Sequence, residues 1–131
     1  MRTSRFTQLQ YTRIYSDPIG ESHFDTVTVE QKLVAAAPPA PPVYISTTRA
    51  ASGYLFYSFE PGWNGGFHPA PTRQFLAMLS GEMEVGTSDG DVRRFGPGDL
   101  GLLEDTTGKG HRTRNIGKGY ATFFVVPVPP A

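Results

Sequence analysis

Apolar and polar side chains alternate along most of this chain in short runs with a period of two, which is the pattern of strands that bury one face. The runs at 74–80 and 120–126 show the alternation most clearly, and the run at 23–31 is rich in β-branched residues with the same period. No segment shows a convincing 3.6-residue period of the kind an amphipathic helix requires. The pattern therefore predicts an all-β protein with little helix.

Glycine and proline mark the ends of these runs at fairly even spacing. Turn signals stand at 61–62, 88–90, 96–99 and 117–119. Between them we expect strands at 53–59, 74–80, 82–87, 91–95, 100–104, 111–116 and 120–126. Many short strands at even spacing are typical of a sandwich or barrel, so we expect one domain, 1–131, with a barrel core at about 43–128.

The N-terminal part of the chain has weaker strand signals. Short strands are expected at 12–15 and 23–31, and the prolines of 35–42 (AAAPPAPP) cannot donate ladder hydrogen bonds. We interpret 11–42 as a strand extension of the domain. Small jelly rolls leave sheet edges that must be covered, so this extension favours a homodimer.

Composition excludes several classes of function. The 12 Lys and Arg residues balance 12 Asp and Glu residues without a basic run, which argues against nucleic-acid binding. There is no cysteine, so thiol nucleophiles and thiolate metal sites are ruled out. Neither a signal-peptide core nor an apolar membrane span is evident, so we expect no membrane partner and a cytoplasmic protein.

Two polar clusters carry the candidate chemistry. The stretch 63–81 (WNGGFHPAPTRQFLAMLSG) contains His68 and Gln74, and the stretch 108–115 (GKGHRTRN) contains His111. Alternation in the second stretch turns His111 to one side of its strand and the neighbouring arginines to the other. We therefore expect His68, Gln74 and His111 to line one cavity inside the barrel.

These clusters resemble the two conserved motifs of the cupin superfamily, whose fold is a jelly-roll or double-stranded β-helix barrel. The positions that match the first motif are Gly62, His68, Gln74 and Gly81; those that match the second are Gly108 or Gly110, His111 and Asn115, and the turn between the motifs is matched by Pro97, Gly98 and Asp99. The resemblance covers about residues 53–126. It implies a small bacterial single-domain cupin that acts on a small organic molecule.

The chain departs from the cupin motif at two metal-binding positions. Ala70 stands where the motif has its second histidine, and Gln74 stands where it has glutamate. A typical cupin site offers three imidazoles and a carboxylate, whereas here the donors would be His68, Gln74 and His111. Because an anionic ligand offsets much of a cation's dehydration, we expect either no cofactor or a divalent transition metal (Fe, Mn, Ni, Cu or Zn) at partial occupancy.

Three functions remain open from the sequence. The first is a metal-free or weakly metallated enzyme of isomerase, dehydratase or cyclase type, in which His68 and His111 are the catalytic acid and base. The second is a metal-dependent dioxygenase with a two-His plus Gln74 site. The third is a non-catalytic cupin that only binds a small molecule. We favour the first, and the identity of the substrate is not encoded in any recognisable motif.

Further residues are expected to serve this site. The substrate-binding candidates are Tyr54, Phe56, Trp63, Gln74 and Met78. Glu104 and Asp105 stand just ahead of the His111 loop, where a carboxylate would orient an imidazole. His23 is remote from both motifs, so a structural role is expected for it.

Overall fold

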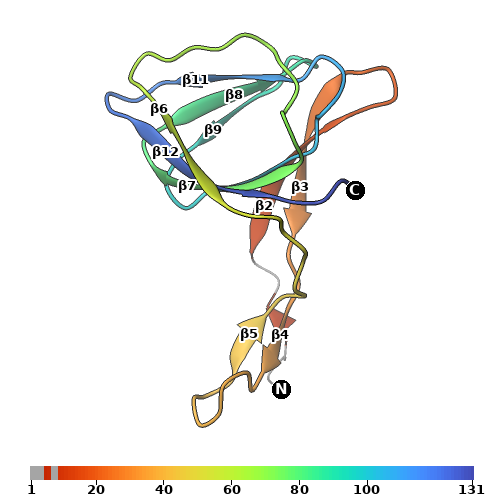
Figure 1. Cartoon of the computed structure of the whole chain (residues 1–131), viewed down its shortest axis with the longest axis vertical. Coiled ribbons are helices and arrows are strands. Elements are labelled where there is room, and N and C mark those ends of the chain that lie inside the picture. Colours follow the sequence, from red (N-terminus) through yellow and green to blue (C-terminus); the bar gives the residue numbers. More distant parts are fainter. Residues whose placement is uncertain (1–4, 7–8) are drawn as a thin grey trace.

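The structure is a computed structural model that describes residues 5–6 and 9–131, and all of its regular elements there are β-strands (Figure 1). The expectation of an all-β protein with little helix is confirmed. Across the described residues, no helix is long and apolar enough to cross a membrane.

The larger sheet has six strands. In spatial order they are β3 (Ser22–Thr28), β2 (Gln10–Ser16), β10 (Leu100–Leu103), β7 (Gln74–Ser80), β12 (Ala121–Pro127) and β6 (Leu55–Phe59). All neighbours are antiparallel except β2 and β10, which run parallel. Strand β7 therefore lies inside the sheet, between β10 and β12, and its side chains are well placed to be buried.

The smaller sheet covers the larger one. It consists of β11 (His111–Asn115), β8 (Met83–Thr87) and β9 (Val92–Phe95). Isolated bridges join Asn64 to Arg114 and His68 to His111, so the segment between β6 and β7 runs along the second edge of β11. The second histidine motif is thus held on a regular strand, and the first is held against that strand by backbone pairing.

Two apolar clusters pack the sheets together. Met78 of β7 packs with Met83 of β8 and with β12 residues such as Phe123. Ile14 of β2 and Leu103 of β10 pack with residues of the smaller sheet in the other cluster. Because both clusters contain residues from both sheets, burial of apolar surface stabilises the barrel as one unit.

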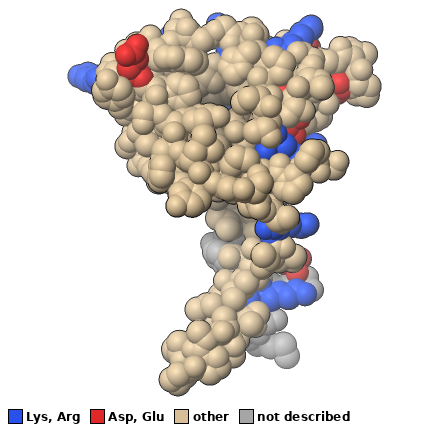
Figure 2. All heavy atoms as spheres, in the orientation of Figure 1, with Lys and Arg blue, Asp and Glu red and all other residues tan. Residues whose placement is uncertain are grey.

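A third, small sheet forms an arm. It contains β1 (Arg5–Phe6), β4 (Gln31–Val34) and β5 (Val43–Ile45), in the order β1-β4-β5. Figure 1 shows it projecting away from the barrel, and Figure 2 shows no charged side chain near its tip. The proline-rich segment 35–42 is the connection between β4 and β5 at this tip.

The predicted N-terminal extension, 11–42, is divided differently in the structure. Strands β2 and β3 belong to the six-stranded sheet, so the barrel begins near Gln10 rather than near residue 43. Of the strands that the structure describes, those of the arm lie outside the barrel. The reason is a long-range parallel pairing of β2 with β10, which buries Ile14 and which no local pattern in the sequence reveals.

Candidate functional site

A cavity of about 500 Å³ lies between the two sheets. Its apolar walls are formed by Ile14, Phe56, Tyr57, Phe59, Trp63, Pro71, Leu76, Val85, Phe95, Leu103 and Phe123, with Gly101 between them; its polar lining consists of Thr12, Ser58, His68, Gln74, Asp99, His111 and Thr113. A mostly apolar pocket with a few convergent polar groups is the usual form of a small-molecule site. His68, Gln74 and His111 all line this one cavity, as the alternation pattern predicted.

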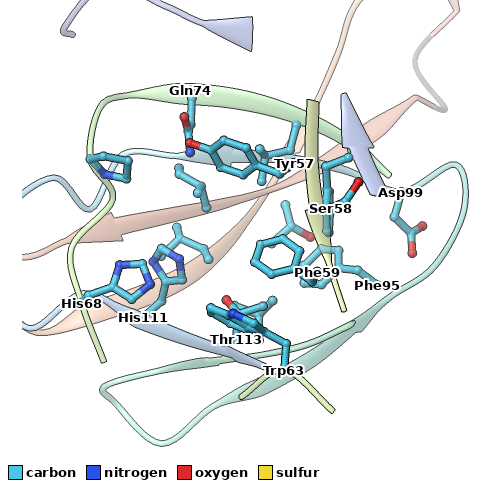
Figure 3. A pocket seen from close by; sticks show the side chains of 18 of the residues that line it. Tyr57, Ser58, Phe59, Trp63, His68, Gln74, Phe95, Asp99, His111 and Thr113 are labelled. Carbon is cyan, nitrogen blue, oxygen red and sulfur yellow. The ribbon is translucent and has the colours of Figure 1, made fainter. Parts of the chain in front are cut away.

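The two histidines stand side by side at one end of the cavity (Figure 3). Their backbones pair in both directions, with N···O distances of 3.0 Å from His68 to His111 and 3.1 Å in return. The ring centroids are 5.2 Å apart. His111 is only 4% exposed, whereas His68 is exposed to solvent. One imidazole is therefore fixed in the protein, and the other stands beside it at the surface.

Gly110 makes this close approach possible. Its φ is +73°, and a Cβ there would lie 2.0 Å from the backbone oxygen of His68. Only glycine fits such a position, because any side chain would meet backbone and would also strain the left-handed conformation. The glycine before His111 thus has a geometric role in joining the two motifs.

Asp105 holds the buried histidine. Its Oδ2 lies 2.6 Å from Nδ1 of His111, and the aspartate is fully buried. The backbone oxygen of Asp105 also accepts a hydrogen bond from the N–H of Ala70, which ties the aspartate to the His68 segment. Since a carboxylate accepts the Nδ1 proton, Nε2 is the nitrogen of His111 left for other chemistry.

Glu104, the other carboxylate considered from the sequence, serves a different purpose. It accepts hydrogen bonds from Arg13 and, at 2.6 Å, from Arg73. Burial opposes the ionisation of Glu104, but the two guanidinium groups outweigh it and hold the pKa of this carboxyl below its usual range. Glu104 therefore joins β2 to the start of β7, and it does not contact either histidine by any hydrogen bond found among the described residues.

Gln74 begins β7 and is 1% exposed. Its neighbours in the sheet are Leu103 of β10 and Pro127 of β12, so its position is set from both sides. Figure 3 shows its side chain pointing from β7 toward the cavity. The side-chain oxygen of Gln74 is buried, and no described residue donates a hydrogen bond to it.

Two of the expected substrate-binding residues do not line the cavity. Tyr54 is 71% exposed; its ring meets Phe56 edge-to-face and lies tilted against Phe124. Met78 has the same strand parity as Gln74, but it lies where the sheets close and packs into the apolar core. Trp63 and Phe56 do line the cavity, with Phe56 contributing from the edge strand β6.

The sequence identifies only part of the aromatic wall. Tyr57 and Phe59 of β6, with Phe95 and Phe123, line the cavity without having been expected there. Tyr54 lies in an exposed cluster with Phe56, although Phe56 also reaches the cavity. Aromatic residues stand on both faces of this strand, so hydrophobicity alone does not indicate which of them face inward.

Two other polar residues have structural roles. Asn115 donates to the backbone oxygens of Phe59, Glu60 and Gly119, and so closes the turn after β11. His23, expected to be structural, lies between Asp17 and Asp89 at 2.8 Å and 2.9 Å. Neither residue lines the cavity.

The donor set does not fit the metal site that the cupin resemblance implies. The Nδ1 atoms of His111 and His68 face Asp105 and the backbone oxygen of Pro69, so each ring could offer a cation only its Nε2, which gives two neutral nitrogen donors. Ala70 supplies no donor, and Gln74 supplies a neutral amide. In the described part of the chain, no group of three or more His, Cys, Asp or Glu side chains converges in a way that could hold a metal ion. The residues present therefore do not make a tight site for a divalent cation.

Comparisons with known proteins bear on the fold. No protein-family model matches the chain, and neither does any curated protein sequence. Among solved structures, it is similar to the SPY1581 protein of Streptococcus pyogenes (21% identity, TM-score 0.44, 66% of this chain and 72% of that one). It is also similar to the cupin domain of Schizosaccharomyces pombe Cnp3 (9%, 0.46, 98% and 86%) and to the ethanolamine utilization protein Q of Salmonella typhimurium (14%, 0.40, 96% and 100%).

The fold and cavity together define a class of protein. The described residues form a small all-β barrel, in which two packed sheets enclose a cavity that carries a histidine pair. The fold class expected from the sequence is confirmed. Likeness at these identities concerns the fold alone, so activity has to be argued from the cavity itself.

Proposed function

We propose that the cavity binds a small organic molecule and that His111, held by Asp105, removes a proton from it. The observation that carries this proposal is the buried Nδ1 to Oδ2 contact of 2.6 Å, which fixes the imidazole with Nε2 free. A positioned histidine with an orienting carboxylate is a common general base, and it adds roughly 10² to 10⁴-fold to a proton-transfer rate.

His68 is the proposed partner in the reaction. Its ring stands 5.2 Å from that of His111, at the solvent-exposed end of the cavity. In the proposed step, Nε2 of His111 takes a proton from a C–H next to a carbonyl, and protonated His68 returns a proton at a different atom of the same molecule. The substrate gains and loses one proton and no electrons, so the reaction is an isomerisation. If water is lost or a ring closes in the same reaction, it is a dehydration or a cyclisation.

This proposal can be tested before the substrate is known. The protein is incubated in deuterated water with a panel of small uncharged ketones, and deuterium at the carbon next to the carbonyl is measured by mass spectrometry. We expect the wild type to exchange at least one ketone faster than buffer. His111→Asn should abolish the excess exchange, whereas Asp105→Asn should reduce it roughly 10² to 10⁴-fold, because the amide lacks the carboxylate's charge and can donate to Nδ1, which favours the wrong tautomer of the imidazole.

The controls separate the alternatives. Ile19→Ser changes an exposed residue of the turn before β3 and should leave exchange unchanged. Chelator should have no effect under this proposal. Exchange that chelator abolishes would instead favour the two-His plus Gln74 metal enzyme. Tight binding of a ketone without any exchange would favour the non-catalytic binding protein.

A further inference from the structure

The side-chain oxygen of Gln74 is a buried polar atom without a partner among the described residues. Gln74 as a whole is 1% exposed. Buried polar atoms are nearly always paired, and leaving one unpaired is destabilising. A leucine or methionine would fill the same volume at the start of β7 without this loss. Asp105 Oδ1 is unpaired in the same way, but Gln74 lines the cavity, so a ligand there could donate to its oxygen.

The charges of the cavity lining limit what that partner can be. Lysine and arginine are absent from the lining among the described residues, and Asp99 is its single carboxylate, at an exposed position in the turn before β10. Among the described residues of the lining, an incoming carboxylate or phosphate would find no lysine or arginine to replace its lost hydration, only the two imidazoles, so its entry is unfavourable. The cavity thus favours uncharged molecules.

The apolar walls indicate the shape of the ligand body. Phe59 contacts Trp63 with ring centroids 4.7 Å apart and an interplanar angle of 66°, and it meets Phe123 at 5.9 Å and 88°. Tyr57 and Phe95 complete this wall. Aromatic rings in such edge-to-face contacts leave flat apolar surfaces, which pack best against a flat ring.

From these observations we infer that the cavity selects an uncharged ring compound whose hydroxyl or N–H group donates a hydrogen bond to the side-chain oxygen of Gln74. Gln74 is then a specificity-determining residue. The inference rests on the proposed function only in taking the cavity as a ligand site, and it does not depend on proton transfer by His111.

Trp63 provides a built-in reporter, since it is the only tryptophan of the sequence and lines the cavity. Its fluorescence is titrated with three probes of similar shape: 4-methylphenol, 4-methylanisole and 4-methylbenzoate. The first can donate a hydrogen bond, the second has the oxygen without the donor, and the third is an anion. We expect 4-methylphenol to bind about tenfold more tightly than 4-methylanisole, and 4-methylbenzoate to bind weakest.

Variants at Gln74 assign the preference to its amide. In Gln74→Leu the tenfold preference for the phenol should disappear, while 4-methylanisole should bind at least as well as before. The midpoint of thermal unfolding should rise, because an unpaired polar group is removed. Gln74→Met serves as a second apolar variant if the leucine variant does not fold. Gln74→Asn, which keeps the amide on a shorter side chain, is the matched control and should retain part of the preference.

Each outcome either supports or overturns the inference that Gln74 selects the ligand. Equal binding of phenol and anisole to the wild type, or a preference that survives in Gln74→Leu, would overturn this inference and leave the proposed proton transfer standing. Preferred binding of the benzoate would also overturn it. If no probe alters the fluorescence or the ligand signals in saturation-transfer NMR, both this inference and the ligand-binding cavity of the proposed function are wrong. His111→Asn should still bind 4-methylphenol, because Gln74 and the aromatic wall are unchanged.

Discussion

At the scale of single residues, small and neutral side chains shape this site as much as the histidines do. Gly110 allows the His68 backbone to approach β11, and Ala70 is buried where a cupin motif has a metal-binding imidazole. Asp105 supplies a buried carboxylate that contacts the cavity residue His111. The site therefore has the geometry for orienting an imidazole rather than for surrounding a cation.

The role of Gly110 is open to a direct test. Gly110→Ala would place a Cβ 2.0 Å from the His68 backbone oxygen and keep a residue with a side chain at a φ of +73°. We expect a loss of roughly 1–3 kcal/mol in the free energy of unfolding from backbone strain alone, with more from the clash. Urea denaturation measures the loss.

Gly96→Ala is the matched control for Gly110→Ala. A Cβ at Gly96 meets nothing within 4 Å, and its φ is not in the left-handed region. This variant should be as stable as the wild type or slightly more stable. Equal stability of both variants would contradict the close approach of the two histidine motifs.

At the scale of elements, turns are connected to one another by charged and polar side chains. His23 of β3 bridges Asp17, in the turn between β2 and β3, and Asp89, in the turn between β8 and β9. Ser22 adds hydrogen bonds to Ser88 and to the backbone oxygen of Gly110. These contacts join the larger sheet, the smaller sheet and the loop that carries His111.

The pKa values of this cluster predict how stability depends on pH. Hydrogen bonds with Asp17 and then Asp89 raise the pKa of His23, against the effect of desolvation. The hydrogen bond from His23 lowers the pKa of Asp17, and that from Thr87 lowers the pKa of Asp89. The stabilisation from His23 is thus complete below its unfolded pKa of about 6.5 and is lost as pH rises through its raised folded pKa. The stabilisation from the aspartates is present above their unfolded pKa of about 3.9 and is lost as pH falls through their lowered folded pKa values.

We therefore expect His23→Gln to reduce the free energy of unfolding most between about pH 4 and about pH 6.5, and less at about pH 9. Urea denaturation at these pH values gives the difference, and NMR titration of His23 should place its pKa above the usual value. Ile19→Ser, in the same turn, changes no titratable group and is the control. A pH-independent effect of His23→Gln would show that the two ion pairs do not contribute.

At the scale of the whole molecule, the arm stands apart from the barrel (Figure 1). Val34 pairs with Val43 across its two main strands, and both are exposed, as is Ile45 beside them. A short sheet with exposed apolar residues is hardly stable by itself in water. The homodimer expected from the sequence would give this surface a partner.

We predict that the wild type is a dimer at micromolar concentration, and that Val43→Glu shifts it to the monomer by placing a charge in the buried contact. Light scattering after size-exclusion chromatography measures the mass. Val92→Glu, at an exposed valine on β9 of the barrel, is the control and should leave the dimer intact. A monomeric wild type would disprove the prediction.

Local pattern was sufficient for the strands and for part of the site. Alternation and turn residues predicted β7, which spans Gln74–Ser80, and located the hairpin turn at Gly90, where φ is +92°. The same alternation turned His111 and Gln74 inward, and both are buried in the cavity lining. These features depend on neighbours in sequence, so the sequence carries them without knowledge of the rest of the fold.

Tertiary structure decided the features that depend on distant segments. Pairing of β2 with β10 brought the N-terminal strands into the barrel, and packing against Met83 and Phe123 placed Met78 in the apolar core rather than in the cavity lining. The tertiary structure also determines that Asp105, and not Glu104, contacts His111. Glu104 instead binds two arginines that come from other strands or loops. The sequence by itself determined which residues can form strands, turns and hydrogen bonds. Their partners follow from long-range packing, in which burial and close approach outweigh any local preference.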